Sequence, residues 1–206
     1  PLVVYAPALA SGWSINKDLP NKPIDYNGYT PTNCGGVETE DVPMYQALAN
    51  SYNIPAVYLF NQIGIQKGIS YSQKFGLNFD NVPEELGISL GGGVTASHLQ
   101  MAQAYATFPN GGVRQSSIAY TEVTDRHGKV LLKSKSKKKK VMDEGVAFIM
   151  TDMLRTVVSN CIAVAASISG VQAGGKTGTT NSNYDIWFDG FTPNYAASLW
   201  IGTDVN

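Results

Sequence analysis

Two short segments of the chain combine residue types that can bind an anion and move a proton. The first is Gly175-Lys176-Thr177-Gly178-Thr179-Thr180, in which a lysine stands beside hydroxyl side chains at the end of an expected strand. Such a group can hold a carboxylate by a point charge and hydrogen bonds, although an exposed strand lysine before a turn gives the same pattern. A phosphate-binding Walker loop is excluded because no helix is expected after Lys176.

The second segment is Ser51-Tyr52-Asn53, at the break between two expected helices. A helix terminus exposes backbone donors, a serine hydroxyl can relay protons, and an asparagine can hold an amide. The pattern is short, since Ser14-Ile15-Asn16 also matches it. Asn53 could instead cap a helix that begins near Pro55. Both interpretations stay open at this point.

Composition excludes several classes of protein. The chain has 206 residues and a formal net charge of −1, whereas a general nucleic-acid binder usually has a basic surplus. Positive charge gathers in one run, Lys133–Lys140, which forms either a solvated loop or a contact for an anionic polymer. Two cysteines, Cys34 and Cys161, and two histidines, His98 and His127, provide neither a disulfide scaffold nor a metal site. No apolar run is long enough to span a membrane.

The hydrophobic pattern predicts an α+β domain, with helices in the middle of the chain and an antiparallel meander at its end. Residues 13–40 form a surface excursion. We expect helices over residues 1–10, from Asp41 to about Ser51, over 55–62 and 69–75, from Thr95 to before Pro109, and from Asp143 onward. We expect a hairpin over 118–132 and strands over 171–179, 185–192 and 195–203, the first two joined by a turn at 181–184.

Some local details follow from the same pattern. Asp41, Thr95 and Asp143 are expected to cap their helices. The helix after Thr95 is expected to bury Leu99, Ala102, Tyr105 and Ala106. The helix after Asp143 is expected to bury Val146, Ile149, Met150, Met153, Leu154 and Val157. The aromatic residues expected in the core of the sheet are Trp187, Phe188, Phe191, Tyr195 and Trp200.

Taken together, the two segments carry a family resemblance. Serine enzymes that act on D-alanyl peptides and β-lactams share Ser-x-x-Lys, Ser-x-Asn and Lys-Thr-Gly, and the last two occur here in that order. Three longer stretches, Met44–Gly64, Leu90–Gly112 and Lys176–Gly202, resemble the transpeptidase domain of class A, bifunctional penicillin-binding proteins from streptococcus-like Gram-positive bacteria. The resemblance implies one domain over residues 1–206 with the serine β-lactamase/transpeptidase-like fold, in which an antiparallel sheet packs with a helical subdomain.

The same resemblance implies the function. The enzyme would be a peptidoglycan D,D-transpeptidase that cross-links stem peptides through an acyl-serine formed at D-Ala-D-Ala, and β-lactams would acylate it. Ser51 would pass a proton to the departing D-alanine, Asn53 would hold the donor peptide, and Lys176 would attract the terminal carboxylate. Thr177 and Thr179 would bind that carboxylate, and the small Gly178 would let another chain approach the strand closely. Tyr52 and Trp187 would border the cleft, with no metal or organic cofactor required.

The Ser-x-x-Lys motif lacks a credible match. Ser14/Lys17 lies among turn residues, and Ser134/Lys137 and Ser136/Lys139 lie in the lysine run. In the family, a proline follows the catalytic lysine, so the resemblance places the nucleophilic serine and its base lysine upstream of Pro1. We therefore expect the chain to be part of a longer protein with an upstream glycosyltransferase domain, anchored on the extracytoplasmic face of the bacterial membrane.

Two alternative functions remain. A serine β-lactamase or D,D-carboxypeptidase uses the same three motifs, although Glu84 and Glu85 do not lie in a recognisable deacylation loop. A non-catalytic module could bind penicillin or stem peptides without turnover, and the missing Ser-x-x-Lys favours that alternative. Labelling with a β-lactam separates the second alternative from the enzymes, and the deacylation rate separates the enzymes from each other.

Overall fold

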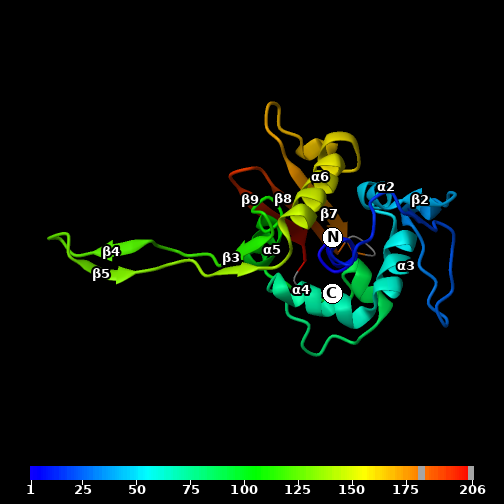
Figure 1. Ribbon diagram of the computed structural model, residues 1–206, viewed down its shortest axis with the longest axis horizontal. Helices are drawn as coiled ribbons and strands as arrows, with labels where there is room; N and C mark the ends of the chain where they lie inside the picture. Colours follow the sequence, from blue (N-terminus) through cyan, green and yellow to red (C-terminus); the bar gives the residue numbers. More distant parts are fainter. Residues whose placement is uncertain (181–183, 204–206) are drawn as a thin grey trace.

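The computed structural model describes residues 1–180 and 184–203, and it has the mixed helix and strand content expected of an α+β domain (Figure 1). The helices are α1 (Tyr5–Ala10), α2 (Met44–Ala49), α3 (Asn53–Ile63), α4 (Ile65–Lys74), α5 (His98–Ala106) and α6 (Glu144–Asn160). The strands are β1 (Asp18–Leu19), β2 (Val42–Pro43), β3 (Val113–Gln115), β4 (Glu122–Thr124), β5 (Val130–Lys133), β6 (Lys138–Lys140), β7 (Gly174–Thr179), β8 (Asp185–Phe191) and β9 (Ala196–Gly202). Short 3-10 turns lie at Cys34–Gly36, Leu86–Leu90 and Val164–Ala166.

The C-terminal strands form the antiparallel meander that the sequence predicts, in the order β7-β8-β9. The predicted turn over 181–184 lies outside the described residues, except for Tyr184. Helix α6 packs against β7, and α5 packs against β8 and β9. Phe191 is buried as expected, Trp187, Phe188 and Trp200 are half-buried, and the expectation for Tyr195 is wrong because its side chain is 79% exposed. Tyr195 lies in the turn between β8 and β9, beyond the cover of either helix.

One apolar core joins the helices to the sheet. Helix α1 lies against α3, α4 and α6, and the largest fully buried side chains include Phe60, Phe75 and Phe108. On α6, Met150, Met153, Leu154 and Val157 are buried as predicted, whereas Ile149 is exposed at the edge of that face. The core therefore joins α1 and α2 to α6, which in turn packs against β7.

Two predicted helix caps are wrong. Asp41 is exposed and does not cap α2, because Val42 and Pro43 pair with β1 as strand β2 and Pro43 takes the cap position. Helix α5 is capped by Ser97, not Thr95. Ser97 and Gln100 bond reciprocally, with each side chain accepting from the other residue's backbone N–H.

Other local predictions need smaller corrections. The buried face of α5 differs from the predicted one, because Leu99 in its first turn is exposed while Ala104 and Tyr105 are buried. Asp143 does hold the cap position of α6, but its side chain makes no capping hydrogen bond. Helix α4 starts at Ile65, earlier than expected, directly after Gly64 ends α3 with φ +90°.

A two-stranded ribbon projects from the body of the molecule (Figure 1). We call residues 113–140 the lysine arm. The predicted hairpin is confirmed, with β4 paired to β5, and β3 pairs with β6 next to the body. The lysine run is a loop only in part, because Lys138–Lys140 form β6.

Candidate active site

Ser51 lies between α2 and α3 in a conformation that side chains rarely adopt. Its φ is +57°, in the left-handed region. The backbone N–H of Ser51 donates to Leu48 O over 3.1 Å and that of Tyr52 donates to Ala47 O over 3.0 Å, which is the hydrogen-bond pattern of a Schellman helix end. Glycine usually takes this position. A serine in this conformation therefore carries backbone strain, and strained residues of this kind cluster at functional sites.

The Ser51 side chain is hydrogen-bonded to Lys176, which comes from a distant part of the chain. Lys176 lies on β7, its residue is only 7% exposed, and its Nζ donates to Ser51 Oγ over 2.7 Å. The same Nζ donates to Thr177 O over 3.1 Å and contacts Thr177 Oγ1 at 3.4 Å. Burial lowers the pKa of Lys176 to about 8. A buried lysine that is bonded to a hydroxyl and titrates near neutral pH can attract an anion and exchange a proton.

Glycines let β7 come close to its neighbours. A Cβ at Gly174 would lie 2.7 Å from the Phe191 ring, and one at Gly175 would lie 2.7 Å from Asp189 O. At Gly178 an added Cβ would meet, among the described residues, only Trp187 Cβ, at an ordinary 3.5 Å. Packing within the chain therefore requires the first two glycines and not Gly178.

Asn53 is the first residue of α3, and it does not cap a helix at Pro55. That alternative is wrong because Pro55 fits inside the first turn, where backbone N–H groups have no helical acceptor. The side-chain Nδ2 of Asn53 donates to Thr32 O over 2.8 Å. This contact fixes the orientation of the Asn53 amide beside Ser51.

The sequence interpretation missed Asn33, which caps α3 from the surface excursion. Its Oδ1 accepts from the backbone N–H of Asn53 over 2.8 Å and from that of Ile54 over 3.1 Å. Its Nδ2 donates to Asn21 Oδ1 and Val37 O, and both Asn33 and Asn21 are buried. The only sequence signal was the turn Asn33-Cys34-Gly35-Gly36, which does not indicate a contact 20 residues away.

Asp189 was also missed, although it is a carboxylate between Phe188 and Phe191 in β8. It lies opposite Lys176 on β7 and Ser198 on β9, and it is buried. Burial raises the pKa of Asp189 to about 6, against the effects of Ser198, the Pro1 nitrogen and His98. Neither Ser198 Oγ nor Asp189 Oδ1 has a hydrogen bond of good geometry within the described residues. The Pro1 nitrogen is itself buried, within the electrostatic reach of both Lys176 and Asp189.

The remaining predicted site residues surround this centre. Thr177 and Gly178 are half-buried and Thr179 is exposed, next along β7. Trp187 pairs with Gly178 across the strands and stacks on His98 at 5.3 Å between ring centroids. Tyr52 is half-buried at the cap position of α3. The structure thus brings Ser51 and Lys176 into direct contact and places Tyr52, Asn53, Thr177, Gly178, Thr179 and Trp187 beside them in sequence or register.

Other candidate sites do not hold. Gly170 to Thr177 has the residue spacing of a phosphate-binding loop, but Lys176 lies within a strand and not before a helix. Ser14 and Lys17 lie in an exposed segment outside any helix. Among the described residues there is no group of three or more potential metal ligands, both cysteines are free, and no helix is long and apolar enough to cross a membrane.

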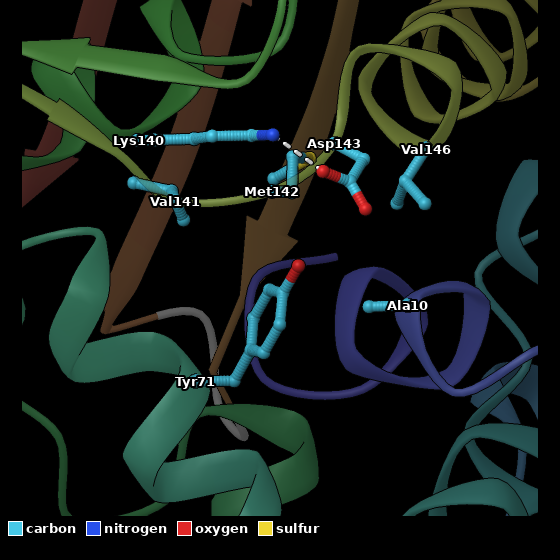
Figure 2. Close-up of a pocket in the computed structure, with 7 residues that line it drawn as sticks. All are labelled: Ala10, Tyr71, Lys140, Val141, Met142, Asp143 and Val146. Carbon is cyan, nitrogen blue, oxygen red and sulfur yellow. Dashed lines mark ion pairs between the residues drawn. The ribbon is translucent and has the colours of Figure 1, made fainter.

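A separate cavity of about 370 Å³ lies at the far end of α1 (Figure 2). Lys140 and Asp143 form an ion pair at its edge, and the Tyr71 hydroxyl points between α1 and the segment that precedes α6. None of the predicted site residues lines it. The cavity is therefore distinct from the Ser51–Lys176 centre.

Comparison with known proteins agrees with this geometry. The family model described as the penicillin-binding protein transpeptidase domain matches residues 2–203. Penicillin-binding protein 2a of Streptococcus pneumoniae (strain D39) is 41% identical over the whole chain, and penicillin-binding protein 1A of Clostridium tetani is 35% identical over 99% of it. The chain spans only 30% and 28% of the length of these relatives.

Solved structures show the same fold. The crystal structure of penicillin-binding protein 1A from Haemophilus influenzae superposes with a TM-score of 0.90 at 25% identity, covering 98% of this chain and 37% of that one. Penicillin-binding protein A of Mycobacterium tuberculosis, solved as an imipenem acyl-enzyme complex, gives a TM-score of 0.88 at 19% identity, covering 100% of this chain and 53% of that one. The arrangement of helices and sheet around Ser51 and Lys176 is thus a known one.

Proposed function

Because the chain belongs to the penicillin-binding protein transpeptidase-domain family, we propose that it provides the acyl-transfer site of a peptidoglycan D,D-transpeptidase. The substrate would be the D-Ala-D-Ala end of a stem peptide, and β-lactams would acylate the same site. The observation that carries this proposal is the 2.7 Å hydrogen bond from buried Lys176 Nζ to Ser51 Oγ. It joins residues from an α-helical junction and a strand into one proton-transfer pair.

The nucleophilic serine and its base lysine would lie upstream of Pro1. The position of the Pro1 nitrogen supports this, because it is buried and lies near Lys176 and Asp189. A chain entering at Pro1 would reach the Ser51–Lys176 pair directly. The serine Oγ would attack the carbonyl of the D-Ala-D-Ala bond as the base lysine takes its proton, giving an acyl-enzyme and releasing D-alanine.

Each predicted residue then has a defined task. Ser51 would pass the proton to the leaving amine, within reach of Lys176. Asn53 would accept a hydrogen bond from the donor peptide's amide with its Oδ1, while its Nδ2 donates to Thr32 O. Lys176 would attract the terminal carboxylate, which Thr177 and Thr179 would bind. The Thr179 N–H would complete an oxyanion hole with that of the nucleophile.

Gly178, Trp187 and Tyr52 would shape the cleft. Space is available at Gly178 because no atom of residues 1–180 or 184–203 comes closer than ordinary contact to an added Cβ, and the substrate backbone would use it. An amine from a neighbouring stem peptide would then attack the acyl-enzyme and form the cross-link. The whole protein would act at the extracytoplasmic face of the membrane, with an upstream glycosyltransferase domain and with no metal or organic cofactor.

The test is penicillin labelling of the full-length protein, followed by intact mass measurement and peptide mapping. We expect one adduct, on a serine that precedes Pro1, with slow deacylation. The variant Ser51→Ala should label far more slowly, whereas the matched control Ser14→Ala should label normally, because Ser14 is exposed and distant in sequence from the pair.

Three results would contradict the proposal. An adduct on Ser51 or Ser14 would place the nucleophile elsewhere. Failure to label a folded full-length protein would indicate a non-catalytic module. Fast hydrolysis of the adduct would indicate a β-lactamase.

A further inference from the structure

The lysine arm carries a charge opposite to that of the rest of the molecule. Residues 113–140 contain nine of the 15 Lys and Arg residues and only two acidic residues, Glu122 and Asp125, for a net charge of +7. The remaining residues hold six positive and fourteen negative side chains, a net charge of −8. Because the arm also projects from the body (Figure 1), its positive field is not cancelled by the acidic body.

The lysines of the arm stand in a regular row. Lys133, Lys135, Lys137 and Lys139 occupy alternate positions and are exposed, while the intervening Ser134 and Ser136 are half-buried. Backbone hydrogen bonds from Ser134 N to Thr121 O and from Ser116 N to Lys137 O keep this stretch paired to the other half of the ribbon. Lys133 ends β5, Lys139 lies in β6, and Lys135 and Lys137 lie in the connection between these strands. An extended chain spaces alternate residues by at most about 7 Å.

Most of this charge has no partner. Among the described residues, ion pairs in the arm join only Lys133 to Glu122 and Lys140 to Asp143. Lys139 lies directly opposite Arg114 on β3, and like charges in such a cross-strand pair repel. The arm therefore holds unpaired positive charge whose repulsion an added anion would relieve.

We propose that the lysine arm binds a linear polymer that carries one phosphodiester for each short polyol unit. Such a chain repeats its charge at an interval comparable to the lysine row, because only a few single bonds separate successive phosphates. A linear partner is favoured because the lysines follow one extended segment and do not spread over a broad face. Nucleic acid is disfavoured because the body is acidic and Tyr120 is the arm's one aromatic residue besides His127, which leaves little to stack on bases.

The experiment measures binding of a synthetic glycerol phosphate oligomer, longer than the lysine row, to the full-length protein at several salt concentrations. Four lysine–phosphate contacts predict a slope of log affinity against log salt of about −3. The variant Lys135→Gln/Lys137→Gln should lower the affinity and reduce the slope by about half. The matched control Lys17→Gln/Lys67→Gln removes the same charge from the body and should leave the affinity and the salt slope nearly unchanged.

Fold and catalysis serve as independent controls. Penicillin labelling should be equal in both variants, because the arm contains no residue of the Ser51–Lys176 centre. The proposal is overturned if the oligomer does not bind at low salt, or if the two variants lose affinity equally. It is also overturned if a polyglutamate of the same length binds as well, or if vesicles of anionic phospholipid bind in preference to the oligomer.

Discussion

Lysine is used in opposite ways in two regions of this molecule. Lys176 is buried, bonded to Ser51 and has its pKa lowered to about 8. In the arm, Lys133 and Lys140 have side chains 63% and 68% exposed, each paired with one carboxylate. The difference arises from solvation, because a charge in a dry site interacts strongly with its neighbours while an exposed one is screened.

Burial therefore decides whether a lysine takes part in proton transfer or contributes only to the electrostatic field around the protein. A single buried lysine that touches a strained serine can tune proton transfer. A row of exposed lysines acts together through summed charge, and each one matters little to folding or catalysis.

Removing the buried lysine should have the largest effect. Lys176→Ala deletes the hydrogen bond to Ser51 and the positive charge of the site, so the rate of penicillin acylation should fall by at least about 100-fold. Lys138→Ala, in the arm, should change it less than about 2-fold. Stopped-flow acylation of the full-length protein measures both. Equal losses of acylation rate in Lys176→Ala and Lys138→Ala would contradict the distinction between the buried lysine and the arm.

Replacing Ser51 by glycine should separate activity from stability. Ser51→Gly removes the hydroxyl that Lys176 contacts, so acylation should fall by roughly 100-fold. The same change relieves the left-handed strain at φ +57°, which should raise the free energy of unfolding by about 1 kcal/mol. Thermal unfolding and acylation kinetics are measured together on the same samples. A loss of both activity and stability would show that Ser51 is retained for structure.

The depressed pKa of Lys176 also predicts how stability depends on pH. Between pH 8 and 10 the unfolded state binds more protons at this lysine than the folded state, so its contribution to stability rises with pH. Because the pKa of Lys176 falls from its ordinary value of 10.5 to about 8 on folding, the difference in unfolding free energy between wild type and Lys176→Met should change by about 2 kcal/mol over this range. Denaturant unfolding at several pH values provides the measurement. The matched pair of wild type and Lys138→Met should show no such change.

The sequence was sufficient to predict the meander, the hairpin and the break at Ser51. These features depend on local signals, namely alternation of apolar residues, turn residues and prolines. The helix caps were less accurate, because Ser97 and Thr95 are both good caps and only the reciprocal bond with Gln100 decides between them. Tyr195 was placed wrongly because an aromatic residue in a short turn has no periodic signal.

The Ser51–Lys176 contact could not be derived from spacing, since 125 residues separate the two. The family motifs suggested this contact, and packing of α2, α6 and β7 in one core brings Ser51 and Lys176 together. Asn33 and Asp189 were missed for the same reason. Their roles depend on which distant groups surround them, and a single sequence does not contain that information.

Asn33 offers a test of intermediate size. Asn33→Ala should lower the free energy of unfolding by about 1 to 2 kcal/mol, because it leaves two N–H groups of α3 without their acceptor. The matched control Asn61→Ala changes an exposed residue of the same helix and should alter stability by less than about 0.5 kcal/mol. Because Asn53 is one of the two capped residues, acylation should also slow in Asn33→Ala alone. Normal acylation in that variant would mean that the Asn33 cap does not position Asn53.

The smallest effect should come from the exposed ion pair of the arm. Lys140 Nζ lies 2.5 Å from Asp143 Oδ1, with both side chains largely exposed. Water and salt screen such a pair, so Lys140→Ala should lower the free energy of unfolding by less than about 1 kcal/mol, and high salt should abolish the difference. Denaturant unfolding at low and high salt measures this. A larger, salt-independent loss would mean that Lys140 supports the start of α6 by packing, and would weaken the contrast between the arm and the buried centre.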